Sequence, residues 1–241
     1  MQTRKMLSLL TANTHGKQKY EKEWKRHWVT VTRNPDAFFN KTEKVITMKY
    51  KGMKKIHQGA YISRYDLRYR MEDGKEKVYE MISRKKNMET EEDLTQGEAE
   101  AVVLILHNQE GDKILLNREF RMATGQWVYN FPAGLIDPGE TPEESAVREL
   151  REETGLELVA ITDYMGISYS AVGFSNEKNI ALVGIAKGEF GHSTSEEEEI
   201  EPGWYTKEQV KELLKNNPFA ARTQTYCYLW ARADFPLLTR C

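Results

Sequence analysis

Glu149, Glu152 and Glu153 have the spacing of side chains that share one side of a helix. At about 100° per residue the three fall on one narrow arc, next to an apolar arc that includes Leu150. Carboxylates this close together repel one another unless a cation lies between them. Oxygen ligands of this kind suit hard divalent ions such as Mg²⁺. The arc therefore predicts a divalent metal site, with an ordinary solvent-exposed acidic face as the alternative.

The helix that carries this arc is predicted to span residues 142–154. Thr141 and Glu144 form a capping-box pattern, and the proline at the first helical position loses no hydrogen bond. Gly155 supplies the left-handed residue that commonly ends a helix. A loop that begins at Gly134 precedes the helix and is expected to bring its backbone close to the carboxylates.

The order of residues from Gly134 to Leu156 resembles the Nudix box. The matching positions are Gly134, Glu140, Arg148-Glu149-Leu150, Glu152-Glu153 and Gly155-Leu156. The resemblance implies hydrolysis of diphosphates linked to another moiety, usually nucleoside diphosphates, with Mg²⁺ or Mn²⁺ as cofactor. It also implies an α/β (α+β) fold, the Nudix α/β/α sandwich, preceded here by a small N-terminal antiparallel β-sheet.

Three further segments, REFR at 118–121, FPAGLID at 131–137 and GFSNE at 173–177, resemble the ADP-ribose pyrophosphatase branch of that family. The implied metal ligands are the backbone carbonyl of Ala133 with Glu149, Glu152, Glu153 and Glu198. The implied catalytic residues are Glu152, Glu196 and Glu198. The implied substrate-binding residues are Arg118, Arg121, Leu135 and Phe174. Four consecutive glutamates at 196–199 leave open which of them is the base, and Arg148 is expected to hold the carboxylates rather than touch substrate.

The substrate that the resemblance implies is ADP-ribose, split into AMP and ribose 5-phosphate. Val172 stands where that branch usually has a proline that marks ADP-ribose specificity. Valine should leave the loop freer, because proline restricts its own backbone and that of its predecessor. A nucleotide sugar such as UDP-glucose or GDP-mannose is therefore the second hypothesis, and RNA decapping a weaker one. A non-catalytic nucleotide-sensing domain is the third, against which the complete box carboxylates argue.

The composition of the chain limits the classes of protein to which it can belong. The chain has 241 residues, 39% hydrophobic and 30% charged. Its longest apolar run, residues 101–106, is too short to span a bilayer, and the apolar run near the start is too short for a signal peptide. The two cysteines, Cys227 and Cys241, form no spaced motif, so a reduced, cytoplasmic setting is expected.

Charge is uneven along the chain. Residues 1–55 hold 14 Lys or Arg against 4 Asp or Glu. We expect residues 1–44 to be a basic N-terminal extension, packed on the acidic remainder or meeting an acidic partner. No helix-turn-helix pattern or basic amphipathic helix is evident, so nucleic acid is not an expected partner.

Residues 45–98 are predicted as an N-terminal β-sheet subdomain and linker, with strands near 45–52, 60–70 and 77–86 and a polar linker at 87–98. Three such strands are marginal alone, so a homodimer with residues 45–85 at its interface is expected. Residues 99–241 are predicted as the Nudix domain. Its strands are expected near 99–106, 113–121, 158–170 and 179–190, and its later helices near 206–214 and 219–233. Tyr226, Leu229 and Trp230 should form the apolar stripe of the last helix.

Overall fold

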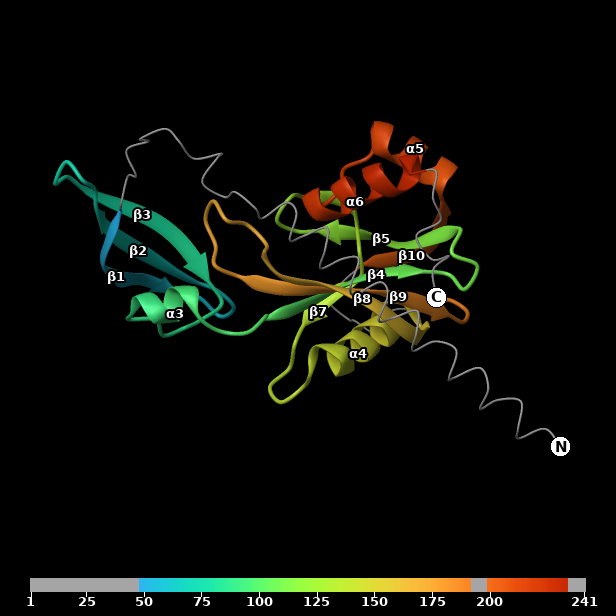
Figure 1. Ribbon diagram of the computed structural model, residues 1–241, viewed down its shortest axis with the longest axis horizontal. Helices are drawn as coiled ribbons and strands as arrows, with labels where there is room; N and C mark the ends of the chain where they lie inside the picture. The colour runs from blue at the N-terminus through green and yellow to red at the C-terminus, as the bar shows by residue number, and fades with distance from the viewer. Residues whose placement is uncertain (1–47, 192–198, 234–241) are drawn as a thin grey trace, which may run out of the picture. The chain divides into compact units, whose positions relative to one another are not determined.

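The computed structural model describes residues 48–191 and 199–233, which form two β-sheets and four α-helices (Figure 1). The strands are β1 Lys49–Gln58, β2 Ser63–Arg70, β3 Glu76–Ser83, β4 Ala101–His107, β5 Lys113–Arg121, β6 Gln126–Asn130, β7 Ala133–Leu135, β8 Glu157–Tyr169, β9 Lys178–Lys187 and β10 Ile200–Thr206. The helices are α3 Glu91–Thr95, α4 Pro142–Thr154, α5 Lys207–Asn216 and α6 Ala221–Arg232.

The three-stranded sheet has the order β1-β2-β3 and is antiparallel throughout. Gly74, at φ 82°, completes the turn between β2 and β3. Strand β1 extends to Gln58, beyond the predicted end near residue 52, because Gly52 lies at a register shift rather than at a strand end. A small core stabilises this sheet: Tyr65, Leu67, Met81 and Met88.

Helix α3 lies within the segment predicted as a polar linker. The Thr90 hydroxyl accepts a hydrogen bond from the Asp93 backbone at 3.2 Å, and the Asp93 carboxylate accepts one from the Thr90 backbone at 2.9 Å. This capping box satisfies two exposed helix-end donors at once. The helix was not predicted, because its capping pattern lies within a strongly charged stretch.

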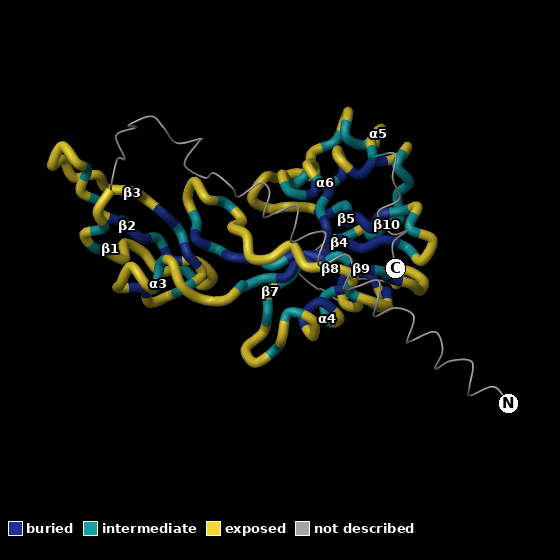
Figure 2. The backbone as a smooth tube through the Cα atoms, viewed as in Figure 1, coloured by how far each residue is buried: buried dark blue, intermediate teal, exposed yellow. Residues whose placement is uncertain are grey.

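The larger sheet has the order β10-β5-β4-β9-β8, with β6 paired to β5 and β7 paired to β4. Successive side chains of a strand point to opposite faces, and both faces of β4 are buried (Figure 2). Val103 and Ile105 belong to the core beneath α5 and α6, whereas Leu104 and Leu106 belong to the core beneath α4. Helices therefore cover both faces, and the predicted α/β/α sandwich is confirmed (Figure 1).

Strand β10 and helix α6 differ from expectation. Strand β10 was not predicted, because Pro202 and Gly203 weaken its sequence signal; proline is tolerated there since β10 lies at the end of the strand order. Trp230 is buried as predicted for α6, but Leu229 is 63% exposed, so its predicted place in the stripe is wrong. Cys227 and Ala231 pack beside Trp230 instead, which rotates the buried stripe by a fraction of a turn.

The described residues, 48–191 and 199–233, belong to one compact unit. The predicted division into 1–44, 45–98 and 99–241 stays a prediction. None of the helices in the described residues is long and apolar enough to cross a membrane.

Candidate metal and catalytic site

The helix that carries the carboxylate arc, α4, has the predicted bounds of residues 142–154. The Thr141 hydroxyl accepts from the Glu144 backbone at 3.2 Å, and the Glu144 carboxylate accepts from the Thr141 backbone at 2.8 Å. Gly155 has φ 77° and ends the helix in the left-handed region. Both ends of α4 are thus fixed by local sequence, which sets the orientation of the acidic side chains between them.

Arg148 organises this arc. Its guanidinium donates to Glu140 at 2.9 and 2.8 Å, to Glu149 at 2.8 Å and to Glu152 at 3.3 Å. It also donates to the Leu135 carbonyl at 2.9 Å. A guanidinium can serve all these acceptors because its planar fork presents five donors. Arg148 therefore holds the carboxylates and the preceding loop together.

The electrostatic effect of Arg148 is greatest at Glu140. Hydrogen bonds from Arg148 are the largest cause that lowers the pKa of Glu140 to about 2. The same contact, first of several, raises the pKa of Arg148 above its usual value. The Arg148–Glu140 pair thus stays charged across the physiological pH range, and it ties the start of the box to its helix.

Gly134 lies against the carboxylate of Glu149. A Cβ at this glycine would fall 1.8 Å from Glu149 Cδ and 2.0 and 2.2 Å from the two oxygens. Glycine is required here by this close approach, since any larger side chain would displace the carboxylate. The loop before α4 therefore forms part of the cradle for Glu149.

Asn117 of β5, for which no role was predicted, lies against the arc, and Glu119 of the same strand is also buried. Asn117, fully buried, donates to Glu153 at 2.7 Å, and Glu153 itself is 4% exposed. Glu119, 6% exposed, accepts from Asn130 at 3.0 Å and lies 3.4 Å from Arg121. Both were detectable in principle as polar residues at alternate positions of a strand that follow a buried apolar run, Ile114 to Leu116.

The donor set suits a divalent cation in its chemistry. Glu149, Glu152 and Glu153 offer oxygen ligands only, which hard ions prefer. Within the described residues no three acidic, histidine or cysteine side chains are already arranged to hold a metal. Two members of the predicted set, Glu196 and Glu198, lie outside the described residues.

The predicted substrate-binding residues differ in their exposure and in the contacts that they already make. Arg118 pairs with Glu201 at 2.6 Å and stacks over Trp127 at 4.4 Å. Arg121 is half-exposed. Leu135 is 43% exposed and lines a hollow of about 520 Å³ with Asp137, Glu140 and other residues. The structure thus places Leu135 beside the arc, whereas Arg118 is already engaged.

Phe174 lies in a loop that β3 holds. The Tyr79 hydroxyl donates to the Gly173 carbonyl, and the Ile82 backbone donates to the Phe174 carbonyl at 2.8 Å. Phe174 is 55% exposed and Val172 80% exposed; both line a hollow of about 350 Å³. These backbone hydrogen bonds restrain the loop that was expected to be freer because of Val172.

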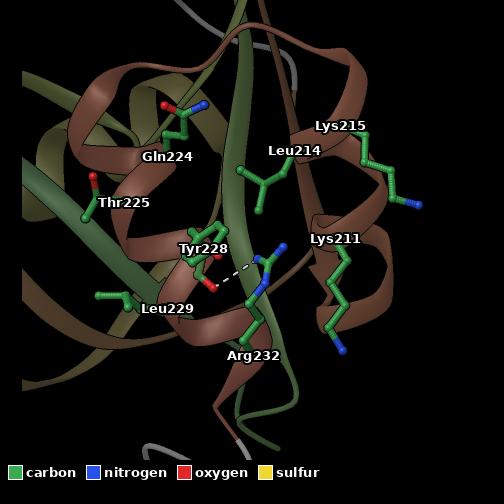
Figure 3. Close-up of a pocket in the computed structure, with 8 residues that line it drawn as sticks. All are labelled: Lys211, Leu214, Lys215, Gln224, Thr225, Tyr228, Leu229 and Arg232. Carbon is green, nitrogen blue, oxygen red and sulfur yellow. Dashed lines mark hydrogen bonds between the residues drawn. The ribbon is translucent and has the colours of Figure 1, made fainter.

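A separate groove lies between α5 and α6 (Figure 3). It measures about 430 Å³ and combines apolar residues with three cationic ones, Lys211, Lys215 and Arg232. Arg232 stacks over Tyr228 at 3.7 Å. None of the described residues predicted for the site lines this groove.

Comparison with known protein families matches residues 97–226 to the NUDIX domain. This match covers more than half of the chain, so the chain belongs to the Nudix family, as the sequence predicted.

Among curated relatives, an uncharacterized Nudix hydrolase of Schizosaccharomyces pombe is 33% identical over 110 residues, which cover 46% of this chain and 51% of the relative. The ADP-ribose pyrophosphatase of Bacillus subtilis is 36% identical over 77 residues, which cover 32% and 40%. The matches thus span about half of the relatives' length or less. The crystal structure of an ADP compounds hydrolase has a TM-score of 0.60 at 21% identity, covering 78% of this chain and 95% of that chain; it supports the fold.

Proposed function

We propose that the chain hydrolyses the pyrophosphate bond of a nucleoside diphosphate linked to another moiety, with Mg²⁺ or Mn²⁺ as cofactor. The observation that carries this proposal is the α4 arc, in which Arg148, Gly134 and Asn117 hold three glutamates in fixed positions. A purely solvent-exposed acidic face would not need such support, since exposed carboxylates are satisfied by water.

The mechanism follows from these positions. A divalent ion, when bound, would neutralise phosphate charge and lower the pKa of the attacking water. Glu149, Glu152 and Glu153, with the Ala133 carbonyl, would hold that ion. Arg121, which is half-exposed, would pair with a phosphate oxygen. We assign the proton-accepting role to Glu196 or Glu198.

ADP-ribose is the substrate that we propose first, with products AMP and ribose 5-phosphate. The support is the REFR, FPAGLID and GFSNE segments, together with similarity to the Bacillus subtilis ADP-ribose pyrophosphatase. The second candidate, a nucleotide sugar, is favoured by the exposed Val172 in place of the usual proline.

The deciding experiment compares kcat/KM for ADP-ribose, UDP-glucose and GDP-mannose with Mg²⁺, with products identified by chromatography. ADP-ribose should lead by at least about tenfold, or about 1.4 kcal/mol of transition-state discrimination. The Glu153→Gln variant, purified identically, controls for contaminating hydrolases. Equal values would indicate a broad diphosphatase, and a reversed order a nucleotide-sugar hydrolase. Nucleotide binding without turnover would indicate the sensing domain.

We also propose a homodimer in which residues 45–85 contribute to the interface. The small sheet carries exposed apolar side chains, among them Ile56, Val78 and Tyr79, and apolar surface of this kind favours association. Light scattering at micromolar concentration should give twice the 28.0 kDa chain mass. A monomer would refute this assembly.

The cytoplasm is the compartment that we propose. The support is the small number of cysteines and the state of Cys227, since burial raises the pKa of its thiol to about 12 and leaves it unreactive.

A further inference from the structure

Asn117 occupies an unusual place in the fold. It is fully buried on β5, directly after Ile114, Leu115 and Leu116, which are also fully buried. Leu115, two residues earlier, belongs to the core beneath α4, so Asn117 faces the same layer. Its Nδ2 donates to Glu153 Oε2 at 2.7 Å, between two side chains that are almost completely removed from solvent.

The other polar atom of the same amide has no such partner. Asn117 Oδ1 is buried and forms no hydrogen bond within the described residues. A buried acceptor left unpaired costs about 1–3 kcal/mol. An apolar residue at this position would avoid that cost, but it would also remove the hydrogen bond to the buried Glu153 carboxylate. The unpaired oxygen itself therefore contributes nothing to the metal-free fold.

The orientation of the Asn117 amide also determines how the two carboxylate oxygens of Glu153 are directed. Because a carboxylate only accepts, the Asn117 N–H group must face it and the carbonyl must face away. One oxygen of Glu153 is thereby oriented, which presets the direction of the other. Hydrogen bonds of this kind to a ligand carboxylate commonly set metal affinity.

We propose that Asn117 is a positioning residue for the divalent cation of the α4 arc. Its Nδ2 orients Glu153, and its Oδ1 accepts a hydrogen bond from a water molecule bound to that cation. This inference rests on the proposed function, because it requires the cation. It assigns to this chain's β5 a part in metal binding that the box motif does not contain.

The test measures Mn²⁺ affinity from the free-ion signal in electron paramagnetic resonance, in a double-mutant cycle. Asn117→Leu replaces both polar atoms by methyl groups at the same branch point and should weaken Mn²⁺ binding by about 10- to 100-fold. In the Glu153→Gln background the same substitution should have a much smaller effect, because the residue acts through Glu153. Tyr226→Phe, which removes a hydrogen bond to His107 on the other side of the sheet, is the matched control and should leave the affinity unchanged.

Thermal unfolding in the presence of a chelator gives a second readout. Mn²⁺ should raise the melting temperature above the value in chelator by less in Asn117→Leu than in the wild type, because a bound ion stabilises the fold according to its affinity. A merely structural asparagine would on substitution lower both melting temperatures equally. Asn117→Val, which suits a strand, tests the same claim if the leucine does not fold. A Mn²⁺ affinity within twofold of wild type, or an equal loss in both backgrounds, would overturn the inference. A wild-type protein that binds no Mn²⁺ would instead refute the proposed function.

Discussion

The two helical layers of the larger sheet differ in what they bury. Beneath α5 and α6 the buried residues are mostly apolar, with Val210, Cys227 and Trp230 at the centre. Beneath α4 the sheet also buries Asn117, together with the carboxylate of Glu153. Burial of charge costs free energy unless it is compensated. The layer beneath α5 and α6 therefore supplies stability. The layer beneath α4 holds the candidate site residues and lowers the stability of the fold.

Each helical layer also contains a titratable group, and the protonation states of the two groups differ in the same way. His107, fully buried beneath α6, hydrogen-bonds through its ring to the Lys113 carbonyl and the Tyr226 hydroxyl at 3.1 and 3.3 Å. Burial lowers the pKa of His107 to about 4, so its ring is neutral at pH 7. On the α4 side, Arg148 instead keeps Glu140 charged. Substitutions in one layer should therefore change stability, and those in the other should change activity.

The largest effect should follow from Trp230→Ala in the apolar layer. Trp230 is 2% exposed, and a cavity of this size typically costs about 3–5 kcal/mol. Urea denaturation should show this loss in the free energy of unfolding, while Mn²⁺ affinity of the folded protein stays unchanged. A variant of wild-type stability, or one that folds but binds Mn²⁺ poorly, would contradict the division.

The next effect concerns pH. The pKa of His107 is 6.5 unfolded and about 4 folded, so the unfolded chain binds the extra proton between these values. Stability should fall as the pH decreases from 6.5 to 4, with a contribution from this group on the order of 3 kcal/mol. His107→Gln cannot titrate, and its melting temperature should decline less steeply over this range. Parallel profiles for the two proteins would exclude the buried histidine as the cause.

On the α4 side, Glu153→Gln should lower turnover by about two orders of magnitude, or about 2.7 kcal/mol. The amide keeps the size of the side chain but removes the charge that a cation needs. The folded structure, checked by circular dichroism, should persist. Retention of most of the turnover at saturating metal would rule out Glu153 as a ligand.

Gly134→Ala should give the smallest effect and the clearest separation of the two properties. The added methyl group displaces the flexible end of Glu149 rather than backbone. We expect kcat to fall roughly tenfold, about 1.4 kcal/mol, with little change in melting temperature. Comparable losses of stability and activity would show that the glycine serves the fold instead.

Local sequence accounts for much of this structure. Thr141 and Gly155 determine the ends of α4, and the strands around it follow from their apolar patterns. Tertiary contacts account for what was missed. Strand β10 exists because β5 offers it a partner, despite Pro202. The role of Asn117 could not be predicted, because only the fold brings it into hydrogen-bond contact with Glu153, which is 36 residues away in sequence.

The hydrogen bonds between β3 and the loop at 171–177 determine how the chain can be shortened or combined with parts of relatives. The donors on Tyr79 and Ile82 lie upstream of residue 97, where the family match begins. A chain trimmed to residues 97–226 would retain the box but lose the strand that restrains Phe174. The matched region is therefore not an interchangeable module. Grafting this loop into a relative would transfer its conformation only if β3 were grafted with it.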